Sequence, residues 1–411
     1  MDGTVQLDAL IVGGGVAGMW ALDTLRRRGL AVWLVEAHAL GAGQTMQSQG
    51  IIHGGLKYAL GGRATEASAA IADMPQRWAD ALDGPLRDVH VRSRSCLLWS
   101  TGGLGRLAMI GAKLGLRTRP RRAEHVPDCL HGVPRPVLDI PEVVLEPASV
   151  LAALASAHTD VLLRCDGTDG LVLTSSATGV HADVKVDGRH LSIAADRVIL
   201  LAGGGNGPLR TMLGLDATVM QTRPLRMVLA RGDLPVLNGH VIKGSKPWLT
   251  ITTTSDAHGV RVWQIGGEVA ERGVTMTPGE TIAMAKSHVL QAMPTLDSAQ
   301  LDELDFGTLD APRFEGRTAD GRRPKTPTLL VDGATLTGWP TKLALAPLLA
   351  DQLTDHCAAS MSGPTRGCPT VPAEIPRPTP AAGPWEPRPT PKAGPCETAT
   401  TWNSDHWARA H

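Results

Sequence analysis

The stretch Leu7-Asp-Ala-Leu-Ile-Val-Gly-Gly-Gly-Val-Ala-Gly18 decides the fold. Its apolar run over residues 7–12 predicts a buried strand, the glycines predict a tight turn, and residues 16–28 predict a helix. Residues 31–35 predict a second strand, which ends at Glu36. Strand, glycine turn, helix and strand in this order predict a βαβ unit with a parallel sheet.

The glycine spacing Gly13-x-Gly15-x-x-Gly18 matches the dinucleotide-binding fingerprint in its proper context of strand and helix. Gly13 permits the turn, Gly15 lets a pyrophosphate approach the backbone, and Gly18 lets the helix pack closely on the strand. The start of the helix offers free N–H groups and the positive end of its dipole to the phosphates. The carboxylate of Glu36 can accept a hydrogen bond from a free 2′-hydroxyl of an adenosine ribose, and it would repel a 2′-phosphate. The alternative is a structural βαβ unit that binds no ligand.

Charge and composition exclude several classes of protein. Forty basic residues balance forty acidic ones among 411 residues, so no global field favours nucleic acid. No run approaches the roughly 20 apolar residues that span a bilayer, and no signal peptide precedes the strand at Leu7. Six cysteines without metal-ligand spacing predict free thiols and no metal site. We expect a cytoplasmic protein, with peripheral contact to the inner face of a membrane left open.

The composition changes near Ala359. Proline recurs from Pro364 to Pro395 with few apolar residues between, so the chain over 359–411 is predicted to be a Pro-rich disordered or polyproline-II tail rather than a domain.

The sequence of the loop after Glu36 favours FAD over NAD as the cofactor. Its sequence Gly43-Gln-Thr-Met-Gln-Ser-Gln-Gly-Ile-Ile-His-Gly-Gly-Leu-Lys-Tyr58 resembles the Ser-Ser-x-x-Ile-His-Gly-Gly-Leu-Arg-Tyr segment of FAD-dependent glycerol-3-phosphate dehydrogenases. More broadly it resembles the D-amino-acid-oxidase superfamily, which includes L-2-hydroxyglutarate dehydrogenase and glycine oxidase. Further similar segments lie at 197–206, 221–228, 266–273 and 317–338, so the resemblance covers residues 7 to about 353.

This resemblance implies an α/β fold with a Rossmann-like, glutathione-reductase-like FAD-binding domain and a second, mixed-sheet α+β substrate domain. The FAD-binding domain would be assembled from residues 1–80, 145–215 and 310–358. The substrate domain would comprise 81–144 and 216–309.

The resemblance and the fingerprint together assign the FAD-binding residues. The turn at 338–342 should point backbone N–H groups at the flavin pyrimidine carbonyl and so stabilise negative charge on the reduced ring. The full set is Gly13, Gly15, Val16, Ala17, Gly18, Glu36, Ala37, Thr45, Gln47, Ser48, Gln49, Gly50, His53, Ala202, Gly203, Gly204, Gly338, Trp339, Pro340, Thr341 and Lys342.

Candidate catalytic residues follow from the same resemblance. His53 would take a proton from an alcohol or amine while hydride passes to flavin N5, since the pKa of histidine lies near working pH. The alternatives are a histidine that only hydrogen-bonds its loop, or one that carries the flavin covalently as in dimethylglycine-dehydrogenase-like members. Lys57 replaces an arginine that binds substrate phosphate in the glycerol-3-phosphate enzymes, and Tyr58 follows it as in that family.

A basic loop completes the substrate side. In relatives an arginine of this region binds the anionic group of the substrate, and the candidates here are Arg317, Arg322 and Arg323. The alternative is a solvated loop. Together the cations favour a small anionic substrate.

The predicted function is an FAD-dependent dehydrogenase or oxidase. It would take hydride from a CH–OH or CH–NH group of a hydroxy acid, amino acid or glycerol 3-phosphate, with a quinone, another acceptor or oxygen receiving the electrons. An FAD-dependent monooxygenase or halogenase is the alternative, but those enzymes usually carry Gly-Asp-Ala-Ala-His where this chain has Val331-Asp-Gly-Ala-Thr335. A non-catalytic flavin-binding protein is the other alternative.

Overall fold

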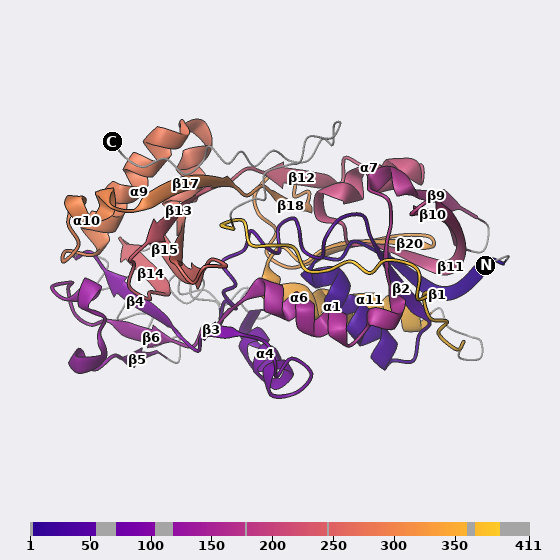
Figure 1. The fold of residues 1–411 in the computed structure, drawn as a ribbon, viewed down its shortest axis with the longest axis horizontal. Helices are drawn as coiled ribbons and strands as arrows, with labels where there is room; N and C mark the ends of the chain where they lie inside the picture. The colour runs from indigo at the N-terminus through magenta and orange to yellow at the C-terminus, as the bar shows by residue number, and fades with distance from the viewer. Residues whose placement is uncertain are drawn as a thin grey trace.

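The computed structural model describes residues 3–54, 71–102, 118–176, 179–244, 246–359 and 366–386. Two large sheets form the two halves of the molecule, which Figure 1 shows at right and left. Lys57 and Tyr58, predicted on the substrate side, lie outside the described residues.

The first sheet contains the glycine turn. Its strands follow the order β19 (Thr328–Asp332), β20 (Thr335–Trp339), β11 (Arg189–Leu200), β1 (Val5–Val12), β2 (Val32–Glu36) and β8 (Leu162–Arg164). From β20 to β8 neighbouring strands are parallel, whereas β19 is antiparallel to β20. The antiparallel pair β9 (Leu171–Ser175) and β10 (Val180–Val186) extends from β11. Ala9, Leu10 and Ile11 are buried without alternation, as expected of a central parallel strand that is covered on both faces.

Helices cover this sheet. Figure 1 shows α1 (Val16–Arg27), α6 (Pro147–Ser156) and α11 (Ala346–Ala359) side by side along it, and α1 contacts both of the others. The short α7 (Asn206–Met212) lies beside β9 on the opposite side.

The second sheet is mixed. Its order is β17 (Asp305–Asp310), β13 (Arg226–Gly232), β16 (Arg261–Gly267), β15 (Lys246–Ser255), β14 (Gly239–Lys243), β4 (Cys96–Ser100), β6 (Leu138–Ile140) and β5 (Arg119–Pro120). All its pairs are antiparallel except β14 with β4.

The two faces of this second sheet differ. One buries Ile251, Trp263 and Ile265 against α9 (Pro278–Ala292). Because side chains alternate along a strand, His240 and Gln264 lie on the opposite face, toward the first half of the molecule. The other α-helices of the described residues are α4 (Met74–Asp83), α8 (Glu268–Arg272) and α10 (Ser298–Asp302).

Two further sheets have two strands each. One pairs β12 (Met220–Arg223) with β18 (Arg313–Gly316), and the other pairs β3 (Val91–Ser93) with β7 (Val144–Leu145). The fold class is the expected one, an α/β dinucleotide-binding half with a second mixed-sheet half. The first sheet takes its strands from within 1–80, 145–215 and 310–358. The second takes its strands from within 81–144 and 216–309, except that β17 ends one residue later, at Asp310. The boundaries between the domains stay predictions.

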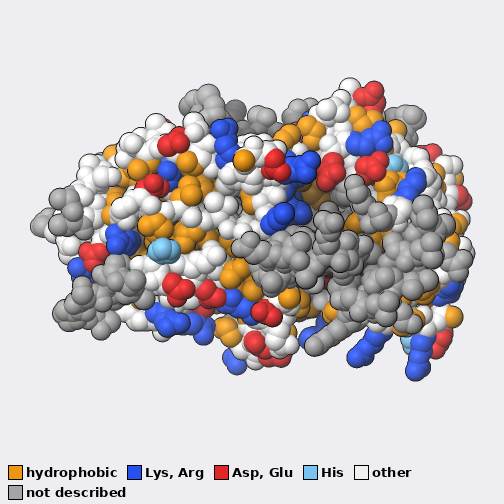
Figure 2. All heavy atoms as spheres, turned by 180° about the vertical axis from the view of Figure 1, so that it is seen from behind, with side chains coloured by type: hydrophobic (Ala, Val, Ile, Leu, Met, Phe, Trp, Pro, Cys, Tyr) orange, Lys and Arg blue, Asp and Glu red, His pale blue; other side chains and the backbone are white. Residues whose placement is uncertain are grey.

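The surface carries charges of both signs. Figure 2 shows Lys and Arg interspersed with Asp and Glu over the described part of the rear face, in keeping with the balanced composition. Among the described residues, no helix combines the length and the apolar character that crossing a membrane requires.

The prediction of a disordered tail over 359–411 is wrong for residues 366–386, which we call the C-terminal strap. It runs along the first half of the molecule and ends on the second (Figure 1). Val371 and Ile375 are each only 3% exposed. The indole Nε1 of Trp33 donates to Pro369 O at 2.7 Å, and Val371 N donates to Asp160 O at 2.7 Å. A proline-rich segment has few N–H groups to satisfy, so it can stay extended and ordered when a neighbouring surface bonds those that remain.

Trp385 anchors the strap to the second half. Its ring is 3% exposed and packs with Met227, Leu229 and Val262 on the second sheet. The guanidinium carbon of Arg92 lies 5.3 Å from the ring centroid, which adds a cation–π contact.

We predict that Trp385→Ala lowers the free energy of unfolding by about 3–5 kcal/mol, the usual cost of emptying a buried tryptophan site. Urea unfolding followed by circular dichroism measures it. Val236→Ala, at a side chain that is 59% exposed, is the control and should change it by less than about 0.5 kcal/mol. Equal, small effects in both variants would show that the Trp385 contact contributes little.

Candidate active site

The glycine turn brings two strand ends together. Gly13 has φ +111°, and a β-carbon added there would lie 2.6 Å from the backbone N and Cα of Ala202. A β-carbon at Gly18 would lie 1.9 Å from Gly13 O. The turn can therefore close only with glycine at these two positions, as the fingerprint predicts.

The turn leads directly into helix α1, where Gly15 is half-buried and Val16 and Ala17 are buried. Gly15 precedes the helix and provides no side-chain cap. Val16 N donates to Thr45 Oγ1 at 3.0 Å, so the hydroxyl of Thr45 lies at the helix N-terminus. This arrangement of N–H groups, helix dipole and hydroxyl is suited to a pyrophosphate.

Glu36 lies at the end of β2, as expected. Its Oε2 accepts a hydrogen bond from Gly14 N at 2.6 Å and its Oε1 accepts one from His38 N at 2.9 Å. These bonds fix the carboxylate, and each oxygen keeps capacity to accept a further bond from a ribose hydroxyl. Ala37, which follows it, is half-buried.

The second and third predicted cofactor segments meet across the sheet. Asn206 connects them, since its Oδ1 accepts from Ala202 N at 2.8 Å and its Nδ2 donates to Gly338 O at 3.2 Å. The indole Nε1 of Trp339 donates to Gly203 O at 3.1 Å. A β-carbon at Gly204 would meet the ring of Phe314 at 2.9 Å, so this glycine accommodates protein packing.

The turn before the last helix is unusual. Thr341 has φ +64°, and Lys342 N donates to Pro340 O at 2.6 Å, which closes a three-residue γ-turn. A positive φ is rare for a β-branched residue, and such outliers gather at ligand sites.

The loop that follows β2 is bonded to the second sheet. Ser48 Oγ donates to Thr45 O at 2.7 Å. Gln49 Nε2 donates to Gln264 O at 2.9 Å and to Thr250 O at 3.3 Å. Leu145 N donates to Gly50 O at 2.9 Å. The side chain of Gln49 thus joins the two halves, and the chain reaches His53 in a fixed path. Gln47 is half-buried within this loop.

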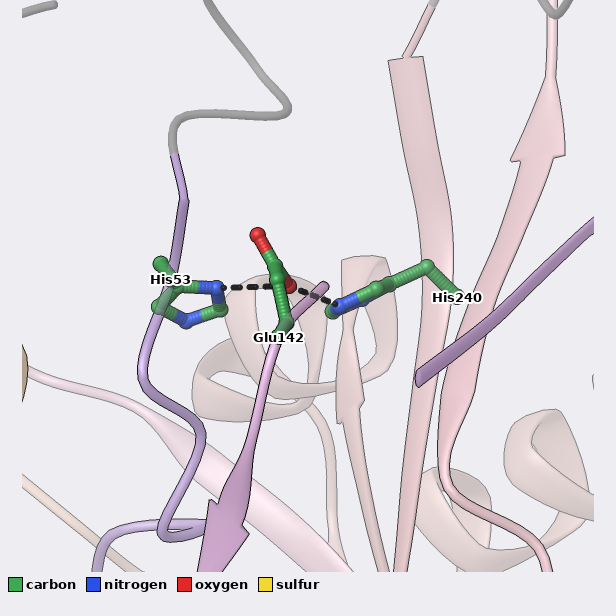
Figure 3. Close-up of side chains that lie close together, drawn as sticks. All are labelled: His53, Glu142 and His240. Carbon is green, nitrogen blue, oxygen red and sulfur yellow. Dashed lines mark hydrogen bonds and ion pairs between the residues drawn. The ribbon is translucent and has the colours of Figure 1, made fainter. Parts of the chain in front are cut away.

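At the end of this path, His53 meets two residues that are far away in the sequence (Figure 3). Glu142 follows β6, and its Oε2 lies 3.3 Å from His53 Nδ1 and 3.1 Å from His240 Nε2. Its Oε1 accepts from Gly54 N at 2.9 Å. His240 Nδ1 pairs with Thr250 Oγ1 at 2.9 Å. The side chains of Glu142 and His240 are 3% and 4% exposed, whereas that of His53 is 39% exposed, so His53 is the member open to a substrate.

Burial and charge act in opposite directions on this cluster. Burial lowers the pKa of His53, Glu142 raises it, and the positive charge of Lys342 lowers it further. Burial raises the pKa of Glu142, but His53 and His240 outweigh burial and hold it well below its ordinary range. The cluster therefore contains an ionised Glu142 beside an imidazole that is neutral near pH 7.

The sequence predicted no metal site, yet the nitrogen and oxygen atoms of His53, Glu142 and His240 lie within 4.8 Å of one another. The two nitrogen–oxygen separations, 3.3 and 3.1 Å, are those of hydrogen bonds. Hydrogen bonding accounts for the geometry, and the expected absence of a metal stays a prediction.

The predicted anion-binding arginines lie around the 317–323 loop. Arg317 is exposed and lines an open cavity of about 550 Å³ together with Arg223. Arg322 is 87% exposed, 3.7 Å from Asp320, and Arg323 is half-buried. The cation whose charge acts on His53 is instead Lys342, which the sequence predicted on the cofactor side.

Sequence reasoning missed Glu142 and His240, and it included Asn206 only as the last residue of the similar segment 197–206. Each is a single polar residue in a separate segment, and nothing in its local spacing indicates a partner. The one available signal is His240, a polar residue that alternates with Gly239 and Val241 in a strand and so belongs to the non-core face.

The fold and the site define a dinucleotide-binding oxidoreductase. Residues 8–346 match the family model described as FAD dependent oxidoreductase. The chain is 39% identical over 398 residues to the probable FAD-dependent oxidoreductase PA4991 of Pseudomonas aeruginosa, with 94% of this chain and 99% of that protein covered. The crystal structure of PA4991 aligns with a TM-score of 0.78 and 34% identity, over 94% of this chain and 99% of that one.

This chain belongs to the FAD dependent oxidoreductase family, and FAD is its cofactor. The crystal structure of glycine oxidase from Geobacillus kaustophilus shares the fold, with a TM-score of 0.64 at 15% identity over 88% of this chain and 96% of that one. The glycerol-3-phosphate dehydrogenase of Mycobacterium leprae is 45% identical over 56 residues, which are 14% of this chain and 10% of that protein. The resemblance to the D-amino-acid-oxidase superfamily is confirmed.

We predict that Gly15→Ala lowers FAD affinity at least about tenfold, equivalent to about 1.4 kcal/mol, without unfolding the protein. The added methyl group meets only Thr45 Oγ1 within 4 Å, at 3.3 Å, but it occupies the space over the helix N-terminus that the pyrophosphate needs. Flavin fluorescence during titration of the FAD-free protein measures the affinity. Gly43→Ala, where nothing lies within 4 Å, is the control, and equal affinities in the two variants would contradict the assigned pyrophosphate site.

Proposed function

We propose that this enzyme oxidises a CH–NH or CH–OH group of a small anionic substrate, an amino acid, hydroxy acid or glycerol 3-phosphate type of molecule. The observation that carries the proposal is the position of His53, which is held by a buried carboxylate on one side and lies within the field of Lys342. FAD, when bound, supplies the acceptor for the hydride.

Glu142 selects the tautomer of His53. An ionised carboxylate can only accept, so Nδ1 of His53 carries the proton that faces Glu142. The lone pair then resides on Nε2, which has no hydrogen-bond partner among the described residues and would accept a proton from a substrate amine or hydroxyl. The carboxylate also stabilises the imidazolium that this transfer produces. Glu142 is thus a positioning residue for His53, and His240 positions Glu142 in turn.

Lys342 supplies the positive charge for the anionic group of the substrate. It follows the γ-turn at Thr341, which fixes its backbone, and its charge acts on His53. A carboxylate bound there would bring its α-carbon near the proton acceptor. Arg317, Arg322 and Arg323 remain the proposed alternatives for this role, with Lys57 and Tyr58 as further candidates.

We further propose that oxygen, a quinone or another small acceptor receives the electrons, and that the enzyme works in the cytoplasm. Cys96, Cys129, Cys165 and Cys368 are free thiols in the described part of the chain, which favours a reducing compartment.

The test is anaerobic reduction of the yellow holoenzyme, measured as the loss of flavin absorbance. The panel of compounds comprises amino acids, N-methyl amino acids, 2-hydroxy acids and glycerol 3-phosphate. Bleaching by one class identifies the substrate. Bleaching by NADH or NADPH alone would favour the monooxygenase or halogenase alternative, and no bleaching by any compound would favour a non-catalytic flavoprotein.

For the compound that bleaches the flavin, we predict that His53→Gln lowers the rate constant of reduction by roughly 10²–10⁴-fold, the usual contribution of a general base. Stopped-flow absorbance measures it. His258→Gln, at an exposed histidine away from the cluster, is the control. A rate in the His53 variant that equals the control would remove His53 from proton transfer.

We predict that kcat/KM falls as pH falls through a pKa below 6.5, because protonated His53 cannot accept a proton and burial lowers its pKa. Glu142→Gln removes a charge that raises this pKa, so the acid limb should move to lower pH. Lys342→Gln removes a charge that lowers it, so the limb should move to higher pH. Shifts in the same direction in both variants would contradict the assignment of the limb to His53.

A further inference from the structure

The C-terminal strap contacts the segment that follows Glu36. Leu40 N donates to Thr379 O at 2.8 Å, and Ala381 N donates to Leu40 O at 2.9 Å. Leu40 and Pro380 form a parallel bridge. The backbone of Leu40 is therefore bonded in both directions by residues that lie more than 330 positions later in the sequence.

Leu40 in turn lies against the glycine turn. Its side chain is completely buried, and a β-carbon added at Gly14 would lie 2.4 Å from Leu40 Cδ2 and 3.1 Å from Glu36 Oε2. Gly41 N donates to Gly14 O at 3.0 Å. Leu40 thus packs on the same backbone whose N–H fixes the carboxylate of Glu36, at the end of the site that receives the adenosine ribose.

The strap is fixed before this contact. Arg164 N donates to Pro376 O at 3.0 Å. The guanidinium of Arg377 donates to Thr159 O at 2.7 Å and to Val371 O at 2.7 Å, which joins the strap to the first half of the molecule and to itself.

The strap is also fixed after the contact with Leu40. Glu386 Oε2 accepts from Ala257 N at 2.8 Å, and Trp385 is buried on the second sheet. Leu40 is consequently held by a segment that is anchored in both halves of the molecule.

We propose that the C-terminal strap is a working part of the FAD-binding site, which retains the cofactor by holding Leu40 against Gly14 and Glu36. Movement of the 36–41 segment would displace the Glu36 carboxylate from the adenosine end of the site, and that movement requires the two Leu40 backbone bonds to break. The strap slows release of FAD without contributing to the chemistry of oxidation.

The position of Leu40 also depends on the contact between the strap and the second half of the molecule. Because the far end of the strap is anchored by Trp385, loosening the second half loosens the hold on Leu40. By linkage, bound FAD should in turn stabilise the strap, since each favours the same conformation of residues 36–41.

The experiment measures the rate at which FAD dissociates from the holoenzyme. The rise in flavin fluorescence after dilution reports this rate. We compare a chain that ends at residue 365 with a chain that ends at residue 386, which keeps the whole strap. The chain without the strap should release FAD at least about tenfold faster, and the chain that ends at 386 should match the full-length protein.

Ala381→Pro is the second variant, because it removes a single N–H donor to Leu40 O and leaves the rest of the strap in place. It should also release FAD faster, and amide exchange at Leu40 and Val371 should be faster in FAD-free protein than in holoenzyme. Release rates in Ala381→Pro equal to those of the chain ending at 386 would overturn the proposal, as would equal amide exchange with and without FAD. Since the readout is cofactor release, the outcome is independent of whether any tested substrate reduces the flavin.

Discussion

The rest of the structure depends on one close backbone contact, where Gly13 at the end of β1 meets Ala202 just after β11. Neither a side chain at Gly13 nor one at Gly18 would fit, because the nearest backbone atoms would lie 2.6 and 1.9 Å from its β-carbon. This contact aligns the carboxyl ends of two parallel strands and directs the N-terminus of α1 toward the same edge. The phosphate site, the Thr45 hydroxyl and the loop to the second sheet all follow from it.

The second constraint is electrostatic. Glu142 is a buried carboxylate, and a buried charge is tolerated only when it is paired and hydrogen-bonded. Its two oxygens accept bonds from His53, His240 and Gly54, which come from both halves of the molecule. Removing one partner of a buried charge typically costs about 3–5 kcal/mol. The arrangement that orients the proton acceptor therefore also helps to hold the two halves together.

The sequence predicted the parts of the fold that depend on local pattern. The apolar run before Gly13 and the run that ends at Glu36 predict two strands joined by a glycine turn and a helix, and the structure has these elements there. The binding of the cofactor by these residues stays a prediction. Glu142 and His240 were out of reach because their partnership arises only when β6 and β14 lie in one sheet beside the His53 loop. The order of the strap could not be predicted for a related reason. Its proline content is typical of a chain without secondary structure, but four buried residues and backbone bonds to Leu40, Asp160 and Arg164 are enough to order it.

The central claim is that bound FAD presents its reactive ring to a histidine whose tautomer is set by Glu142. A crystal structure of the yellow holoenzyme tests it most directly. We predict that the isoalloxazine lies between the turn at 338–342 and His53, and that Nδ1 of His53 still bonds Glu142. A ring bound elsewhere, or a His53 turned away from Glu142 in the presence of FAD, would contradict the account.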